Sequence, residues 1–101
     1  MIRHIVMWKV KDGALGNTKE QNIALMKQQL ELLEDKVGKN NGLLEVEVGV
    51  GFNPRGYDIS LICTLMSLNA LKIYDVHPEH LKVKEFVSQV ASERVVVDYE
   101  I

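Results

Sequence analysis

The sequence lacks an excess of positive charge, a pair of cysteines and any long apolar run. Its 101 residues include 12 Lys and Arg against 14 Asp and Glu, which gives a formal net charge of −2. This balance argues against a nucleic-acid-binding surface and against a polybasic membrane anchor. No run approaches the ~20 apolar residues of a membrane span, and the first residues lack the apolar segment of a signal peptide. We therefore expect neither nucleic acid nor membrane as a partner, which leaves a small molecule or another protein.

Cys63 is the single cysteine, so an internal disulfide and a cysteine-based metal cluster are excluded. Its neighbours are aliphatic, which favours a buried thiol over a reactive nucleophile. A free thiol is typical of a reducing compartment, and we predict a cytoplasmic protein. A glycine-rich phosphate loop is also missing, because Gly49-Val50-Gly51 leads into Phe52-Asn53-Pro54 and no helix. A nucleotide site is not expected.

Hydrophobic periodicity divides the chain into strands and helices. Alternating or continuously apolar segments predict strands, and apolar residues at three- and four-residue spacing predict helices. The predicted strands are 2–10, 43–50, 57–65 and 94–100, and the predicted helices are 18–37, 68–76 and 78 to about 90. No repeat, linker or low-complexity block interrupts this order, so we predict one domain over residues 1–101.

Local signals mark where the helices begin and end. Thr18, with a glutamine three residues later, is a candidate N-cap of the long helix, and Gly38 supplies a conformation that ends it. Ser67 is a candidate N-cap of the short helix. Pro78 disfavours helical geometry at His77, so we expect a break there and Pro78 as the first residue of a new helix.

The resulting order, β-α-β-β-α-β, predicts an α+β, ferredoxin-like fold with a four-stranded antiparallel sheet and helices on one face only. The other face would nevertheless be apolar, through Ile5, Met7, Ile62 and Val96. A large exposed apolar patch is rare on a monomer, and a second copy on a two-fold axis can cover it. We predict a homodimer whose sheets pack into an α+β barrel. The polar residues expected at the rim of this face are Glu45, Glu47, Ser60 and Asp98.

The densest group of chemically active residues lies between Tyr74 and His80. Histidine suits proton transfer near neutral pH, and a tyrosine hydroxyl can orient a carbonyl or stabilise an enolate. In the first turn of its helix, His80 should stay neutral and basic, because the helix dipole disfavours imidazolium there. His4 lies on the strand face expected to meet the helices, where it would line a pocket. Tyr74, His80 and His4 are the candidate catalytic residues.

A purely structural interpretation of the same residues stays open. His77 could cap the new helix, His80 could bond backbone near the break, Tyr74 could simply pack, and His4 could be a satisfied core histidine. His77 and His80 lack the nearby cysteine or carboxylate spacing of a zinc site, so we predict no metal and no cofactor.

Taken together, these residues resemble the stress-responsive α/β-barrel (Dabb) family. The matching segments are IRHIVMWKVKD, EVEVGVGFN, the stretch from Tyr57 to Val87 with its Tyr-x-x-His-Pro-x-His motif, and VVVDYE. The resemblance implies a ferredoxin-like fold that dimerises into a barrel. It implies no single activity, since many members have none assigned. A polyketide cyclase in the family uses a tyrosine as carbonyl-orienting acid and a histidine as base of an aldol closure, roles that would map onto Tyr74 and His80.

Three functions follow as hypotheses. The first is a homodimeric Dabb protein of undefined activity that binds a small apolar metabolite. The second is a cofactor-independent enzyme with aldol chemistry of the cyclase kind, in which His80 is the base, Tyr74 the acid and His4 assists. The long helix, residues 18–37, lacks the aromatics that line the cyclase pocket, which argues against a polyketide substrate. The third, a monooxygenase or haem-handling protein, has only Trp8 and His77 to support it.

Overall fold

The computed structural model describes residues 1–101 and shows the predicted order of elements, with the second crossover split in two. The elements are β1 (Ile2–Val10), α1 (Lys19–Val37), β2 (Leu43–Val50), β3 (Ile59–Leu65), α2 (Leu68–Val76), α3 (Pro78–Val90) and β4 (Ala91–Glu100). Short 3₁₀ turns at Ala14–Gly16 and Lys39–Asn41 flank α1. The last strand begins three residues earlier than predicted, directly where α3 ends.

The ends of the helices follow the sequence signals. Thr18 and Gln21 form a reciprocal capping box on α1, and Gly38 ends the helix with a positive φ of 81°. The Ser67 side chain accepts a hydrogen bond from the Ala70 backbone at the start of α2. Pro78 is the first residue of α3, as predicted. The devices at the N-terminal ends pair or remove a backbone N–H that the helix leaves unsatisfied, and the Gly38 N–H donates to the Glu34 carbonyl at the C-terminal end of α1.

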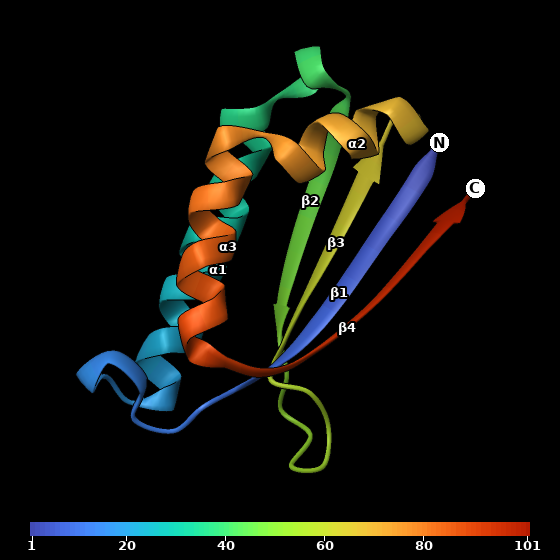
Figure 1. The fold of residues 1–101 in the computed structure, drawn as a ribbon. Coiled ribbons are helices and arrows are strands. Elements are labelled where there is room, and N and C mark those ends of the chain that lie inside the picture. The colour runs from blue at the N-terminus through green and yellow to red at the C-terminus, as the bar shows by residue number, and fades with distance from the viewer.

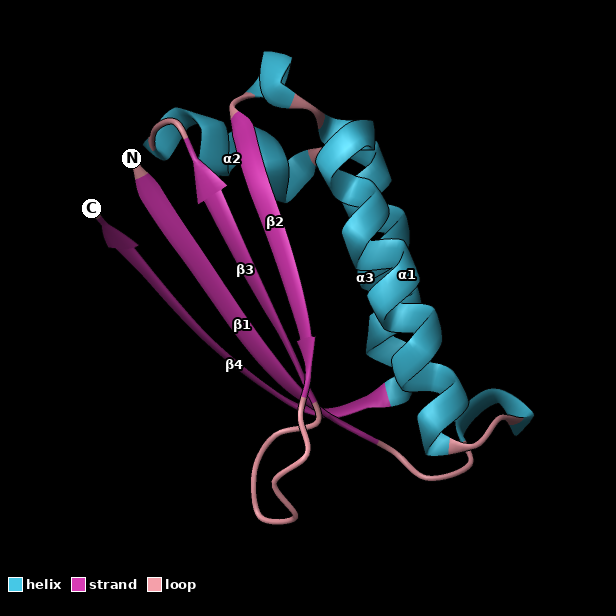
Figure 2. Cartoon of the chain, turned by 180° about the vertical axis from the view of Figure 1, so that it is seen from behind, coloured by secondary structure: helices cyan, strands magenta, loops and turns pink.

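The four strands form one antiparallel sheet in the order β2-β3-β1-β4, which is the ferredoxin-like arrangement. All three helices lie on one side of this sheet, and no element covers the other side (Figure 1). The view from behind shows α1 and α3 running side by side and α2 crossing one end of the strands (Figure 2). None of the helices combines the length and the apolar character needed to cross a bilayer.

The hydrophobic core fills the space between the helices and the central strands. Its fully enclosed side chains come from every helix and strand except β4, among them Leu33, Leu65 and Tyr74. The strand β4 contributes no buried residue, because the helices do not reach over it. The sheet is therefore packed over β1 and β3 and open along its β4 edge.

The register of β4 corrects one detail of the predicted faces. Val96 pairs with Val6 and Asp98 pairs with His4, so both lie on the helix side of the sheet. The predicted position of both residues, on the opposite face, is wrong. The apolar run from Val95 to Val97 has no alternation of its own, so only its pairing with β1 decides which residues face the helices.

The face without helices is apolar nonetheless, as expected. Its exposed members on β1 and β4 are Met7, Val95, Val97 and Tyr99, at 38–51% exposure, and half-buried Ile5 and Ile62 lie between them. We call this set of six residues the outer face. Monomeric proteins rarely leave such a contiguous patch in water.

Candidate histidine-lined pocket

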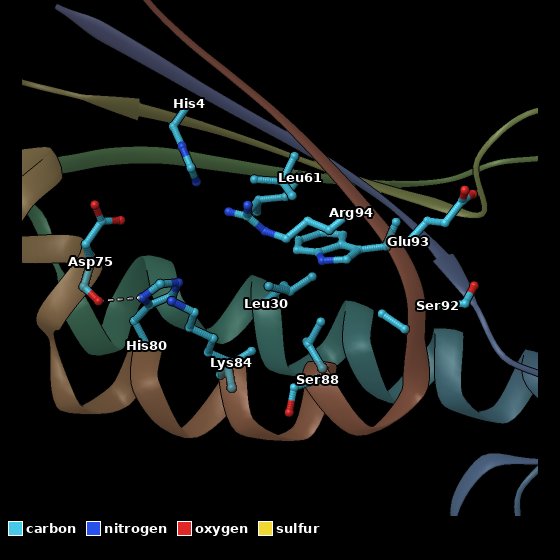
Figure 3. Close-up of a pocket in the computed structure, with 15 residues that line it drawn as sticks. His4, Leu30, Leu61, Asp75, His80, Lys84, Ser88, Ser92, Glu93 and Arg94 are labelled. Atoms are coloured by element: carbon cyan, nitrogen blue, oxygen red, sulfur yellow. Dashed lines mark hydrogen bonds between the residues drawn. The ribbon is translucent and has the colours of Figure 1, made fainter.

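The open edge of the core contains a pocket of about 270 Å³ between the sheet and α3. Its apolar wall consists of Val6, Trp8, Leu30, Leu61, Val83, Val87 and Ala91. Figure 3 shows His4 entering from the sheet and His80 from α3, on opposite sides of the space. A concave apolar wall with a few polar groups is typical of small-ligand sites.

The break between α2 and α3 positions His80. The His77 ring accepts a hydrogen bond from the Glu79 backbone N–H through Nδ1 at 3.1 Å, so His77 is the N-cap of α3, as the structural interpretation predicted. In an unbroken helix that N–H would bond the carbonyl of Asp75. The carbonyl is left free instead, and His80 Nδ1 lies 3.2 Å from it (Figure 3).

This contact fixes the tautomer of His80. A carbonyl oxygen only accepts, so Nδ1 carries the proton and Nε2 of the neutral ring keeps its lone pair. Burial lowers the pKa of His80 below 6.5, and the nearby Lys84 ammonium lowers it further, although the Asp75 backbone bond opposes the shift. The direction matches the prediction of a neutral ring, with burial as the main cause. His80 can therefore act as a base near neutral pH.

His4 is held in the same manner from the sheet side. It is 5% exposed, and its Nδ1 hydrogen-bonds the carboxylate of Asp98, its cross-strand partner on β4. An ionised carboxylate only accepts, so Nδ1 is the donor and Nε2 is the free nitrogen. His4 faces the helices and lines the pocket, and its bond to Asp98 is what the structural interpretation of a satisfied histidine requires. Asp98 was missed as a site residue because the sequence placed it on the other face.

Tyr74 packs between the two histidines without lining the pocket. Its ring centroid lies 4.3 Å from that of His80 and 5.8 Å from that of His4. The hydroxyl is buried beside the Cys63 thiol and makes no hydrogen bond of normal geometry. Burial raises the pKa of Tyr74, and the adjacent Cys63 thiol raises it further, so the phenol stays protonated. The structure thus brings all three predicted site residues together, with Tyr74 as the central one.

Cys63 lies on β3 beneath this group and is fully buried. Burial raises the pKa of its thiol to about 12, although the Tyr74 contact opposes part of that shift. A thiol that stays protonated is a poor nucleophile. No three histidine, cysteine or carboxylate side chains gather closely enough to hold a metal ion.

Two cationic side chains, Lys84 of α3 and Arg94 of β4, line the pocket and were not predicted. Neither makes an ion pair or a side-chain hydrogen bond within the chain. Their sequence neighbourhood resembles an ordinary solvated surface. The sequence does not show which residues of β4 face the helices. The register with β1 shows that Arg94 and Asp98 lie on the helix side.

The fold and pocket define a ferredoxin-like α+β protein with a histidine-lined site at its open sheet edge. The model of the Stress responsive A/B Barrel Domain (Dabb) matches residues 2–101, so the chain belongs to this family. No curated protein matches the chain by sequence.

Solved structures share the fold over nearly the whole chain. A dimeric ferredoxin-like protein of unknown function from Bacteroides fragilis is 29% identical, with a TM-score of 0.85 over 99% of this chain and 95% of that chain. A Dabb family protein from Mesorhizobium loti is 19% identical, with a TM-score of 0.71 over 99% and 95%. The hydroxynitrile lyase from Passiflora edulis is 21% identical, with a TM-score of 0.77 over 99% and 92%. The last two likenesses concern the fold alone.

Proposed function

We propose that residues 1–101 form one Dabb domain that acts as a homodimer and binds a small, mainly apolar metabolite in the histidine-lined pocket. The observation that carries this proposal is the pocket itself, which is apolar over its walls and has two oriented imidazoles at one end. Its volume of about 270 Å³ is near the lower limit of small-ligand sites, so the ligand is small. A cytoplasmic setting agrees with the free, buried Cys63.

A second copy is the proposed cover of the outer face. Phe52, in the loop between β2 and β3, is 97% exposed and lines a hollow together with Met7 of the outer face. The apolar surface therefore continues from the sheet onto the loop. The similar protein from Bacteroides fragilis is dimeric, which supports the same assembly here. Two such faces related by a two-fold axis would bury each other and form the predicted barrel.

The binding proposal can be tested with the intrinsic fluorescence of Trp8, the single tryptophan, because its indole lines the pocket. Titration with small aromatic compounds should change the emission in a saturable way. Ser88→Phe should abolish the change by filling the pocket mouth, whereas Gln89→Phe, next to it on α3 and outside the lining, should leave it intact. Saturable binding that survives Ser88→Phe would place the ligand elsewhere.

The same geometry favours a second candidate, a cofactor-independent enzyme. His80 and His4 each keep a free Nε2, and the buried Tyr74 hydroxyl beside them lies outside the pocket lining. In this candidate His80 accepts a proton from carbon next to the carbonyl, and Tyr74 must turn its hydroxyl into the pocket to donate a hydrogen bond to the forming enolate. This arrangement suits aldol-type chemistry.

Binding and activity measurements on the variants Tyr74→Phe and His80→Ala separate the two candidates. Tyr74→Phe removes only the unpartnered hydroxyl, so a binding protein should keep its ligand affinity. An enzyme should lose turnover of its substrate while the fold stays intact, and His80→Ala should have the same effect. A variant pair that retained full turnover would show that these residues are not catalytic.

A further inference from the structure

We infer that the ligand of the histidine-lined pocket is a carboxylate, held by its acid group between Lys84 and Arg94 with its apolar body against Trp8. This inference names the ligand class for the proposed binding function and so rests on that function. Neither the family match nor the solved neighbours assign a ligand to this pocket.

The two cations approach the same space from different elements. Lys84 projects from α3 and Arg94 from β4, and both line the pocket. In Figure 3 the Arg94 guanidinium reaches toward the side where His4 lies, and Lys84 lies beside His80. Lys84 lowers the pKa of His80 and Arg94 lowers the pKa of Tyr74, which is consistent with both charges lying at the histidine end.

The acids of the pocket do not neutralise these cations. Glu93 pairs with Lys9 at 3.4 Å. Asp75 makes no ion pair, and its carboxylate lies at the α2 end of the pocket in Figure 3. Asp98, which lies outside the lining, is paired with His4. Lys84 and Arg94 are thus free of ion pairs, and with Asp75 as the one unpaired acid of the lining they give the cavity one more unpaired positive charge than negative, which favours an anionic guest.

A carboxylate fits this arrangement better than other small anions. The guanidinium fork of Arg94 matches the two oxygens of a carboxylate, and the Lys84 ammonium can supply a further donor. Beyond the cations the wall is formed by Trp8, Leu30 and Val87. A hydrocarbon or aromatic body stabilises the complex there by leaving water. Free phosphate has no such body and would leave the apolar wall unfilled.

The test uses two probes of equal shape, 3-phenylpropanoate and its neutral amide, 3-phenylpropanamide. Trp8 emission reports binding of each, and calorimetry provides the affinity. We expect the acid to bind about tenfold more tightly than the amide, because charge-assisted hydrogen bonds exceed neutral ones by roughly that factor. The preference should shrink as salt is added, since Lys84 and Arg94 are both exposed to solvent.

Charge-removing variants assign the preference to the two residues. Arg94→Gln and Lys84→Gln should each reduce acid binding several-fold and leave amide binding unchanged. Lys72→Gln is the matched control, because it removes the same charge from an exposed, unpaired lysine outside the pocket. It should change neither affinity.

Each failure has a distinct meaning. Equal binding of acid and amide, or loss of acid preference in Lys72→Gln alone, would overturn the carboxylate inference and leave the binding pocket standing. Inorganic phosphate that bound as tightly as the acid would overturn the role of the apolar body. If neither probe bound at millimolar concentration, the proposed binding function itself would be contradicted.

Discussion

The strands β3 and β4 both pair with β1, one on each side, yet they have opposite environments. The inward residues of β3, Ile59 to Leu65 in alternation, are at most 2% exposed. Every residue of β4 after Ala91 is exposed. The difference arises because the helices cover β3 and stop short of β4. The β3 side of the sheet therefore stabilises the subunit, and the proposed ligand pocket and dimer interface both depend on the exposed strand β4.

The largest expected effect is on the β3 side. Leu65→Ala should lower the free energy of unfolding by about 3 kcal/mol, because it leaves a cavity in a fully buried site. Val96→Ala on β4 should cost less than about 1 kcal/mol, since its side chain is largely in water. Urea denaturation at one protein concentration measures both. Equal losses would mean that β4 is as well packed as β3.

The two faces of β4 should differ in assembly. Val97→Lys places a charge on the outer face and should weaken dimerisation about hundredfold, or roughly 2.7 kcal/mol, by burying an ammonium. Val96→Lys, on the adjacent residue and the helix side, should leave the dimer intact. Sedimentation velocity across a concentration series distinguishes them. A monomeric wild type, or dimers in both variants, would refute the proposed interface.

The buried hydroxyl of Tyr74 should contribute little or nothing to the free energy of unfolding. Tyr74→Phe removes a group that has no hydrogen-bond partner, so its free energy of unfolding should lie within about 1 kcal/mol of wild type or above it. Thermal and urea unfolding measure this change. A loss of several kcal/mol would reveal a hydrogen bond to Tyr74 and remove one reason to consider the hydroxyl catalytic.

The smallest expected effect is a pH dependence from His80. Its folded-state pKa lies below the ordinary value of 6.5, so between these two values the unfolded chain binds more protons than the folded one. Stability is therefore fully present above pH 6.5 and decreases as the pH falls below it. His80→Asn should flatten this slope relative to wild type, and His77→Asn, which keeps a capping side chain, should not. A slope unchanged in His80→Asn would contradict the shift.

The fold could be predicted because local signals and periodicity agreed. The capping box at Thr18 and the proline at residue 78 fix helix ends with chemistry that is written in a few neighbouring residues. The cluster around His80 was visible for the same reason. What escaped prediction depended on pairing between distant segments. Arg94 reaches the pocket, and Asp98 reaches His4, only through the register of β4 with β1, which an unbroken valine run does not specify.

The break between α2 and α3 determines where the proton of His80 lies. Pro78 breaks the helix and the His77 ring binds the Glu79 N–H, so the carbonyl oxygen of Asp75 is left free. That oxygen accepts a hydrogen bond from His80 and so determines which ring nitrogen of His80 carries the proton. A substitution that rejoined the two helices would withdraw this oxygen without altering any side chain in the cavity. The protonation pattern of the cavity is therefore set at a hinge whose own side chains do not line it.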